Sequence, residues 1–468
     1  MFQRKVVLFI LMGVFLTQFS CKEKIKRYKP TTTIVEGQIS DAESPVIILS
    51  GDVEIKSVLD PTGKFIIQAE LEKAGIYSLT LSNQTLQIFI VPGDRISLNT
   101  TQSTFNTNPK FEGDHMLENN YLIVHDSLKR NTEPIDFKKY FTQTEDELIR
   151  SVEQRMSLFN TNQQEYQKLN RPFDEVFAEL ITEEVMFDAA ALKLEYPVYY
   201  YYFLPESKMK LTDTYDSFLQ NLEIDNDDNL LLPSYKKFLE TFLEFKSRFD
   251  TPDNTESLNI NKFDNISNLF QSKMVREFLY YNLMKDLLET SINDVSLLMD
   301  KYHLLQSNIQ YLNEIDADFK SWEKLLKGNS SPDIICSNLK GKTITLENFK
   351  GKVVYLDVWA TWCGPCLREI PFLEKMQAKY QGRNDVAFIS ISIDQDKNSW
   401  KSMVEQKNMK GFQFYADHIS QKHLVEHFLI KGIPRFIIID KGGKIWNANA
   451  PRPSDENVFN ELNEALQN

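Results

Sequence analysis

The feature that most constrains the fold is a central stretch, residues 114–327, that contains no glycine. Glycine supplies the positive-φ positions of the tight turns that join neighbouring strands, so a sheet built from hairpins is unfavourable there. Apolar residues instead recur at helical spacing, and clusters of Asn, Asp and Pro separate the runs, of which the clearest are Phe173–Leu192, Tyr235–Phe249 and Lys273–Thr290. We therefore expect a central all-α domain over residues 114–327.

The segment before this stretch, residues 33–110, consists of short alternating apolar runs separated by turn residues. The turn signals include Asp60-Pro-Thr-Gly63 and Pro92-Gly-Asp94. Strands repeated at a spacing of ~8–12 residues indicate an antiparallel sandwich or barrel. We expect an N-terminal antiparallel β-domain, similar to a β-sandwich, over these residues.

The last part of the chain, residues 331–468, alternates strand-like with helical segments. The strand-like segments are 353–358, 386–393, 412–415 and 436–439, and the helical ones follow residue 366, cover 397–407 and 421–428, and begin again near 455. Lys441-Gly-Gly-Lys444 has the composition of a hairpin turn. This order predicts an α/β domain with a mixed sheet, and the chain is therefore expected to be multidomain.

Charge and cysteine content exclude several classes of protein. The net charge is −13, and the charge of residues 331–468 alone is slightly positive, so the preceding part is the acidic one. Nucleic-acid binding needs clustered Lys and Arg, and we expect none. Four cysteines are too few for a disulfide-stapled scaffold, and the single CxxC lacks the second pair of a zinc site. We predict neither a metal nor a cofactor.

The N-terminus has the pattern of a targeting segment. Arg4 and Lys5 precede a mostly apolar run over Val6–Phe19, which is shorter than the ~20 residues that span a bilayer. The cysteine after Ser20 makes this segment resemble a bacterial lipoprotein signal. The resemblance implies a signal peptide over residues 1–20, lipidation of Cys21, and a tether over 21–32. It also implies an exported protein of the cell envelope or periplasm, held on the membrane by the lipid.

The most reactive group that the sequence offers is the dithiol of Cys363-Gly364-Pro365-Cys366. A β-branched apolar run precedes it and a helical pattern follows it. Two cysteines separated by two residues can close and open a small disulfide. The leading interpretation is therefore a thiol–disulfide oxidoreductase.

Residues 331–468 resemble a thioredoxin-fold domain of the TlpA-like branch of exported, membrane-anchored thioredoxins. The motifs are Asp357-Val-Trp-Ala-Thr-Trp-Cys-Gly-Pro-Cys366, Glu369-Ile-Pro371 and Gly432-Ile-Pro434. The N-terminal stretch resembles a small β-domain of unknown function that precedes such exported thioredoxins. The Gly-Pro dipeptide between the cysteines matches reducing thioredoxins, so the reducing direction is expected.

Each residue of the CxxC motif has an expected role within this resemblance. Cys363 should lie exposed at a helix N-terminus, where backbone N–H groups and the helix dipole favour the attacking thiolate. Cys366, more buried and one turn into the helix, should attack the mixed disulfide and release the substrate. Gly364 should allow a tight bend, and Pro365 fits the first helical turn.

Two carboxylates are candidates for the base that deprotonates Cys366. Asp357 occupies the position of the buried acid of thioredoxins, where loss of solvent should raise its pKa. Glu369 follows Cys366 by three residues and shares its helix face. We favour Asp357 as the base and Glu369 as a group that tunes the potential of the dithiol, and both remain candidates.

The resemblance also assigns residues that meet the substrate. Ile433-Pro434 matches the cis-proline of the fold, and the backbone of Ile433 is expected to pair with an incoming peptide. Trp362 is expected to shield the disulfide and contact the substrate, whereas Trp359 is expected to pack inside the domain. Cys336 is interpreted as a small core residue.

Three functions follow as alternatives. The first is reduction of disulfides in exported client proteins, with electrons from an unidentified donor. The second is a peroxiredoxin-like peroxidase, suggested by Thr361, although the Pro-x-x-x-Thr-x-x-Cys pattern is missing. The third is a binding or scaffold lipoprotein of the envelope that carries a thioredoxin module, suggested by the size of residues 1–330.

Overall fold

The structure is a computed structural model, and it describes residues 27–134, 136–204, 207, 210–249 and 258–468. The predicted signal peptide and the lipidation of Cys21 lie outside these residues. Within the described part of the chain, no helix combines the length and the apolar character needed to cross a membrane. The chain divides into two compact units, Met1–Phe245 and Lys246–Asn468.

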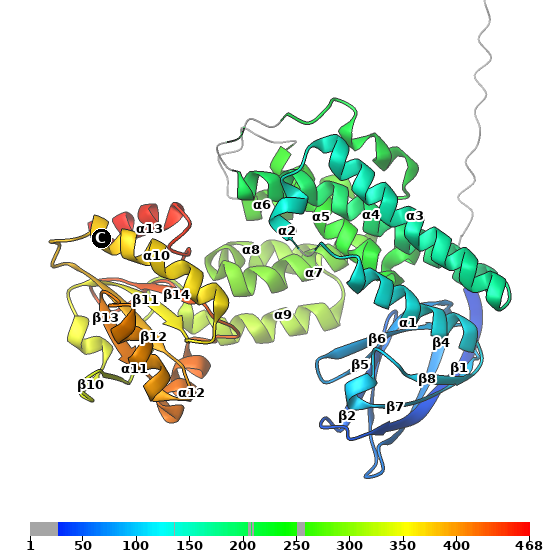
Figure 1. The fold of residues 1–468 in the computed structure, drawn as a ribbon, viewed down its shortest axis with the longest axis horizontal. Helices are drawn as coiled ribbons and strands as arrows, with labels where there is room; N and C mark the ends of the chain where they lie inside the picture. The colour runs from blue at the N-terminus through cyan, green and yellow to red at the C-terminus, as the bar shows by residue number, and fades with distance from the viewer. Residues whose placement is uncertain (1–26, 135, 205–206, 208–209, 250–257) are drawn as a thin grey trace, which may run out of the picture. The chain divides into compact units, whose positions relative to one another are not determined.

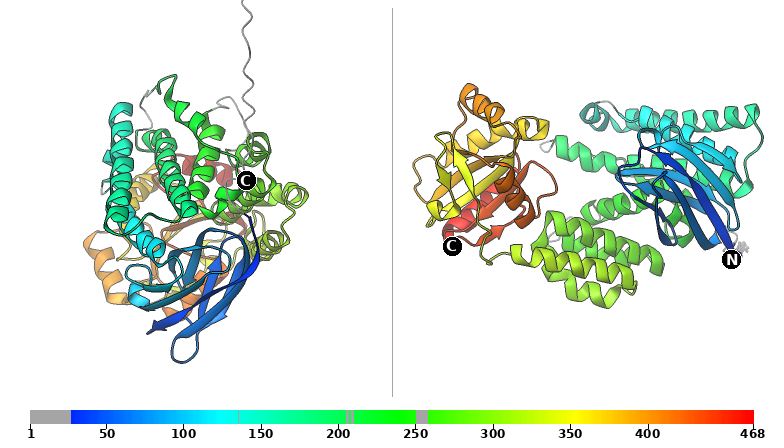
Figure 2. Two further views of the ribbon diagram at one scale, coloured as in Figure 1. Left: turned by 90° about the vertical axis from the view of Figure 1, so that its right-hand side faces the viewer. Right: turned by 90° about the horizontal axis from the view of Figure 1, so that it is seen from below.

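The first unit begins with two four-stranded sheets that share one apolar core. One sheet has the order β4-β1-β7-β8 and the other β3-β2-β5-β6. The strands are β1 (Arg27–Ser40), β2 (Val46–Ser50), β3 (Glu54–Val58), β4 (Lys64–Lys73), β5 (Gly75–Leu81), β6 (Gln84–Ile90), β7 (Arg95–Thr101) and β8 (Lys110–Gly113), with a 3₁₀ turn η1 (Gln102–Thr104). The core draws on both sheets, for example on Val35 of β1 and Leu49 of β2. Figure 2 shows β1, in dark blue, as a long strand of this part.

Two expectations for this region are wrong. The strand β1 already begins at Arg27, inside the predicted tether, because its antiparallel ladder with β4 continues back from Gln38↔Lys64 to Arg27↔Lys73. The domain is also not wholly antiparallel, since β1 and β7 pair in parallel. The strands between β1 and β7 bring the chain back to the same sheet, with β7 running in the direction of β1. Local turn signals do not show which strands become neighbours.

Helices follow the sheets, as the glycine-free stretch predicts (Figure 1). They are α1 (Met116–Asn131), α2 (Phe137–Phe141), α3 (Glu145–Leu169), α4 (Glu175–Phe203), α5 (Pro233–Phe249), α6 (Leu258–Leu269), α7 (Lys273–Thr290), α8 (Ile292–Leu305) and α9 (Ile309–Trp322), with 3₁₀ turns η2 (Tyr215–Asn221), η3 (Asp227–Leu231) and η4 (Glu323–Leu325). The two compact units divide inside α5, so the helices do not form one separate domain. Helices α6 to α9 belong to the second unit.

The second unit ends in a seven-stranded mixed sheet of order β10-β9-β13-β12-β11-β14-β15. Its strands are β9 (Cys336–Asn338), β10 (Thr343–Ile344), β11 (Val353–Trp359), β12 (Val386–Ser392), β13 (Phe412–Tyr415), β14 (Arg435–Ile439) and β15 (Ile445–Asn447). Its helices are α10 (Gly364–Lys379), α11 (Lys397–Gln406), α12 (His418–His427) and α13 (Asn457–Gln467), with a 3₁₀ turn η5 (Leu346–Phe349). The strands β11, β12 and β13 run parallel, and β14 runs antiparallel to β11. This arrangement agrees with the expected thioredoxin fold.

One face of this sheet is covered by α10 and α13. Tyr355 of β11 shares a buried cluster with Met376 of α10 and Leu462 of α13. Because side chains two residues apart on a strand point to the same face, Asp357 points to this face as well. The helix that follows the CxxC motif therefore lies on the sheet face to which Asp357 points.

Candidate active site

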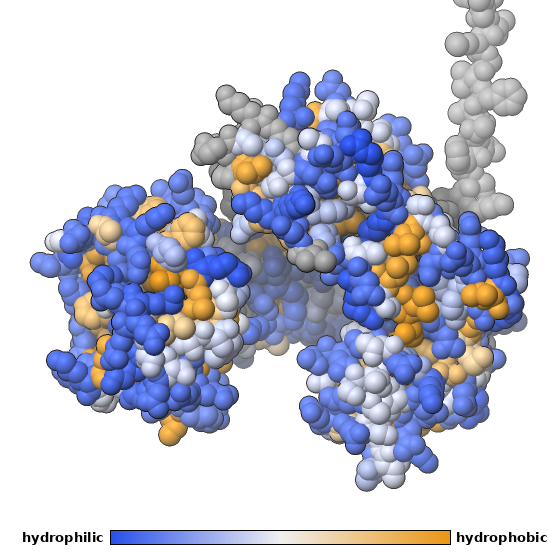
Figure 3. Space-filling view, viewed as in Figure 1, coloured by the Kyte–Doolittle hydropathy of each residue, from blue (hydrophilic) through white to orange (hydrophobic). Residues whose placement is uncertain are grey.

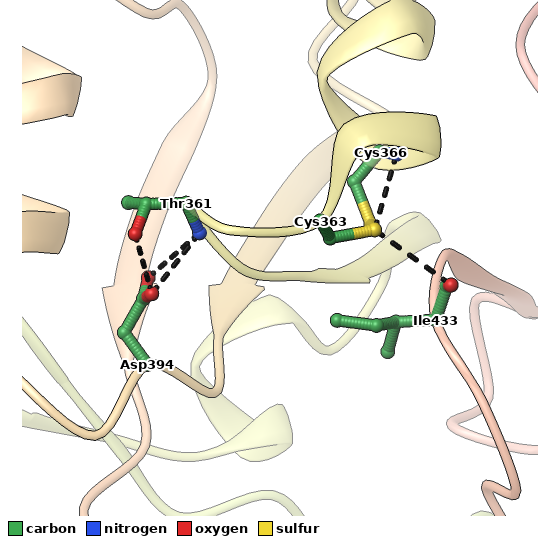
Figure 4. The surroundings of a disulfide bond; sticks show 5 residues. All are labelled: Thr361, Cys363, Cys366, Asp394 and Ile433. Carbon is green, nitrogen blue, oxygen red and sulfur yellow. Dashed lines mark hydrogen bonds between the residues drawn. A yellow bond between two sulfur atoms is a disulfide. The ribbon is translucent and has the colours of Figure 1, made fainter.

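The two motif cysteines lie where the central strand β11 passes into α10. Cys363 is the N-cap residue of α10 and forms a disulfide with Cys366, with 5.3 Å between the Cα atoms. The backbone N–H of Cys366 donates to Cys363 Sγ over 3.1 Å (Figure 4). A helix N-terminus has backbone N–H groups without helical partners, and here one of them is directed at the sulfur.

The expected exposure of Cys363 is wrong for this disulfide form. Cys363 and Cys366 are each only 4% exposed. The carbonyl oxygen of Ile433 lies 3.7 Å from Cys363 Sγ, so the loop before β14 covers the sulfur (Figure 4). The expected exposure was based on the helix terminus alone. The loop that covers the sulfur comes from a distant part of the sequence.

The peptide bond between Ile433 and Pro434 is cis. Beside the disulfide, Trp362 is 67% exposed, whereas Trp359 at the end of β11 is buried. The predicted packing of Trp359 inside the domain is therefore confirmed.

Figure 3 shows groups of apolar side chains among hydrophilic ones on the visible face of the molecule.

Gly364 and Pro365 form the first turn of α10. The position of Pro365 fits the expectation for a residue without a backbone N–H. Gly364 does not need positive φ, and an added Cβ would meet only the end of Arg368 at 3.9 Å. A Cβ at this position would therefore be accommodated without a clash.

Asp357 is a buried carboxyl group on the central strand. Burial, together with a smaller effect of the charge of Glu369, raises its pKa to about 7, although a hydrogen bond with Ser390 opposes the shift. Ser390 is its register partner on β12. A carboxyl group with such a pKa can exchange a proton near neutral pH.

Glu369 lies in α10, three residues after Cys366, and is also buried. Its Oε2 accepts from the backbone N–H of Ser454 over 3.0 Å, and its Oε1 accepts from the Ser454 hydroxyl over 2.9 Å. Ser454 lies before α13 and was not predicted. Its only sequence signal is a position shortly before a helix.

A second unpredicted group holds the loop between β11 and α10. The buried carboxylate of Asp394 accepts from the backbone N–H of Thr361 over 3.0 and 3.1 Å and from the Thr361 hydroxyl over 2.6 Å (Figure 4). The hydroxyl of Ser392 donates to the same carboxylate over 2.7 Å. A carboxylate just after a buried parallel strand, β12, was the signal that could have identified this contact.

The remaining chemistry-bearing residues lie elsewhere. Cys336 is buried, as expected of a core residue, and burial raises the pKa of its thiol to about 12. Among the described residues, no group of three His, Cys, Asp or Glu side chains is placed to hold a metal ion.

The mixed sheet, the cysteine pair at the start of α10 and the cis-proline loop that faces it define a class. The C-terminal part of the chain is a thiol–disulfide oxidoreductase of the thioredoxin fold. A family model described as Redoxin matches residues 326–466.

One relative that is 32% identical agrees with this assignment. The thiol-disulfide oxidoreductase ResA of Bacillus cereus is 32% identical over 127 residues, which are 27% of this chain and 71% of that relative. The chain therefore belongs to this Redoxin family of thiol-disulfide oxidoreductases. A solved structure of a Bacteroides vulgatus protein is 38% identical and covers 30% of this chain and 98% of its own, with a TM-score of 0.29. The thioredoxin domain of a thiol-disulfide oxidoreductase from the same organism is 28% identical and covers 30% and 99%, with a TM-score of 0.28.

Proposed function

We propose that the protein reduces disulfides of exported client proteins through Cys363 and Cys366. The observation that carries the proposal is the position of Cys363 Sγ, between the N–H of Cys366 and the carbonyl oxygen of Ile433. The N–H of Cys366 favours the thiolate of Cys363. The carbonyl oxygen of Ile433 belongs to the backbone beside which a client segment would lie.

In the first step, the Cys363 thiolate attacks one sulfur of a client disulfide. A mixed disulfide forms, and the other client sulfur leaves as a thiolate. The N–H of Cys366 and the dipole of α10 stabilise the attacking anion.

In the second step, the Cys366 thiolate attacks Cys363 Sγ, and the client is released with both thiols reduced. The chain is left with the Cys363–Cys366 disulfide, so two electrons have passed to the client. Asp357 takes the proton of Cys366, because its pKa of about 7 matches transfer near neutral pH. Glu369, one helical turn beyond Cys366, adds negative charge and thereby tunes the potential of the dithiol.

Client binding uses the surface around the disulfide. The backbone of Ile433 offers strand-like pairing, and Trp362 offers an exposed aromatic face. Gly364 leaves room for the chain that carries the scissile disulfide, and Pro365 lies beside it in the same contact surface. The Gly-Pro dipeptide supports the reducing direction. A thiol donor then reduces the Cys363–Cys366 disulfide, which restores the dithiol for the next client.

The proposed location is the bacterial cell envelope or periplasm, with the protein attached to the membrane through a lipid on Cys21. The apolar run of residues 6–19 before Ser20-Cys21 supports this location. The peroxidase alternative loses its sequence argument, since the Thr361 hydroxyl that suggested it donates to Asp394.

The test is reduction of insulin by the full-length chain with dithiothreitol as the thiol donor. We expect the wild-type chain to accelerate reduction well above dithiothreitol alone, and Cys363→Ser to remove the acceleration. Cys336→Ser is the matched control, because it removes a cysteine outside the motif. An unaccelerated reaction with the wild-type chain would refute the function.

A further inference from the structure

The loop that faces Cys363 is held on both sides by helices that lie outside the thioredoxin-like part. Before the loop, Lys431 forms an ion pair with Glu289 near the C-terminus of α7. After the loop, the guanidinium of Arg435 lies over the ring of Trp322 at the end of α9, 5.4 Å from its centre. The two cations stand two residues before and two residues after Ile433.

The contact with Trp322 is buried. Arg435 is 9% exposed and Trp322 is 4% exposed. The Nε of Arg435 donates to the carbonyl oxygen of Ala448 over 3.0 Å, which ties the loop to the segment that follows β15. A cation that is stacked on an aromatic ring and removed from solvent holds its backbone firmly.

The contact with α7 includes more than the ion pair. Asn449 Nδ2 donates to the carbonyl oxygens of Glu289 over 2.6 Å and of Thr290 over 3.1 Å. These carbonyl groups belong to the last turn of α7, where helical partners are missing. The segment next to Arg435 is therefore fixed to the same helix end as Lys431.

The segment that connects α9 to the sheet also forms backbone hydrogen bonds with the sheet. Gly328 N–H donates to the carbonyl oxygen of Ile445 over 2.8 Å, and Ile445 N–H donates to that of Asn329 over 2.8 Å. Ser330 forms a bridge with Lys444. The chain between α9 and β9 thus follows the β14–β15 hairpin instead of forming a loose linker.

We infer that α7 and α9 position the cis-proline loop and thereby set how the site binds a polypeptide client. Glu289, Lys431 and Trp322 are positioning residues, since none of them touches the sulfur atoms. The inference rests on the proposed function, because it assigns these contacts to the binding of the client backbone at Ile433. It gives α7 and α9 a role in client binding, beyond that of a spacer.

The inference separates two kinds of substrate. A polypeptide disulfide depends on backbone pairing at Ile433 and therefore on the exact position of the loop. A small disulfide such as 5,5′-dithiobis(2-nitrobenzoate) needs only access to Cys363. Loosening the loop should raise KM for the polypeptide disulfide and leave the reaction rate with the small disulfide unchanged.

The test uses the full-length chain with Glu289→Gln, Lys431→Gln and the double variant. Lys422→Gln is the matched control, because Lys422 pairs with Glu426 at 3.8 Å and its side chain is 68% exposed, against 63% for Lys431. We expect KM for insulin to rise about two- to fivefold in each single variant, the effect of losing one exposed ion pair. The double variant should add nothing further, since both changes remove the same pair.

The kcat for insulin, the rate with the small disulfide and the melting temperature should stay at the values of the Lys422→Gln chain. Variants indistinguishable from that control in KM for insulin would overturn the inference and leave the proposed function standing. A parallel loss of melting temperature and of reaction with both substrates would also overturn it, because the contacts would then be merely structural. A wild-type chain that leaves insulin oxidised would overturn the proposed function, and the inference with it.

Discussion

The carbonyl oxygen of Ile433 lies 3.7 Å from the Sγ of Cys363, although the two residues are 70 positions apart in the chain. The same sulfur accepts the N–H of Cys366 over 3.1 Å. The nucleophile is thus placed between a donor that stabilises its anion and a carbonyl oxygen that does not. Small movements of the Ile433 loop therefore change both access to the sulfur and its electrostatic surroundings.

Replacing the buried carboxyl group should slow the second step of the exchange. We expect Asp357→Asn to lower the rate of Cys366 attack about 10²-fold, the usual contribution of a general base. The wild-type rate should rise with pH up to about 7, where Asp357 becomes ionised, and the variant should lack this rise. Stopped-flow fluorescence with a peptide disulfide measures the step, with Asp385→Asn as an exposed control. An unchanged rate in Asp357→Asn would rule out the base assignment.

The same group should make the stability of the fold depend on pH. The pKa of Asp357 is raised from 3.8 to about 7, so Asp357 loses its proton at a lower pH in the unfolded chain than in the folded one. The free energy of unfolding therefore falls as the pH rises between these two values. The loss above pH 7 should reach up to about 4 kcal/mol, at about 1.4 kcal/mol for each pKa unit. All five tryptophans lie in the second unit, so their fluorescence during urea unfolding reports on it. Asp357→Asn should remove the part of this pH dependence that Asp357 contributes, and a parallel profile in the variant would contradict the prediction.

How far the sequence alone predicts this molecule depends on whether a feature is local. The CxxC motif, the strand before it and the Ile433–Pro434 dipeptide are short patterns, and the structure places them at one site. The contacts of Glu369 with Ser454 and of Asp394 with Thr361 join residues 85 and 33 positions apart, so a local signal at one residue does not identify its partner. The parallel pairing of β1 with β7 was missed for the same reason. The burial of Cys363 was missed because the covering loop comes from a distant segment.

Neutralising the second carboxylate should change the redox potential of the pair. Glu369 places negative charge one turn from Cys366, which disfavours the thiolate of the reduced form. We expect Glu369→Gln to raise the reduction potential by ~10–30 mV, where 30 mV corresponds to about 1.4 kcal/mol. Equilibration with glutathione buffers measures this shift, and Glu374→Gln, on the same helix, is the control. A lower potential in Glu369→Gln would contradict the assignment.

Removing the carboxylate that holds the Thr361 loop should cost stability and activity together. Asp394→Ala leaves the N–H and hydroxyl of Thr361 and the hydroxyl of Ser392 without their acceptor. Each unsatisfied buried group costs ~1–3 kcal/mol, so we expect a large fall in the free energy of unfolding and slower attack by Cys363. Asp396→Ala removes only an exposed N-cap of α11 and should cost about 1 kcal/mol. Equal losses in the two variants would show that Asp394 does not hold the loop.

The measurement that tests the central claim most directly is the trapping of a mixed disulfide. The reduced full-length Cys366→Ala chain is mixed with a peptide that contains one disulfide, and the products are digested and analysed by mass spectrometry. The account predicts a stable adduct on Cys363, and none when Cys363→Ala is used with Cys366 intact. An adduct on Cys366 or Cys336, or no adduct at all, would contradict the assignment of Cys363 as the attacking thiol.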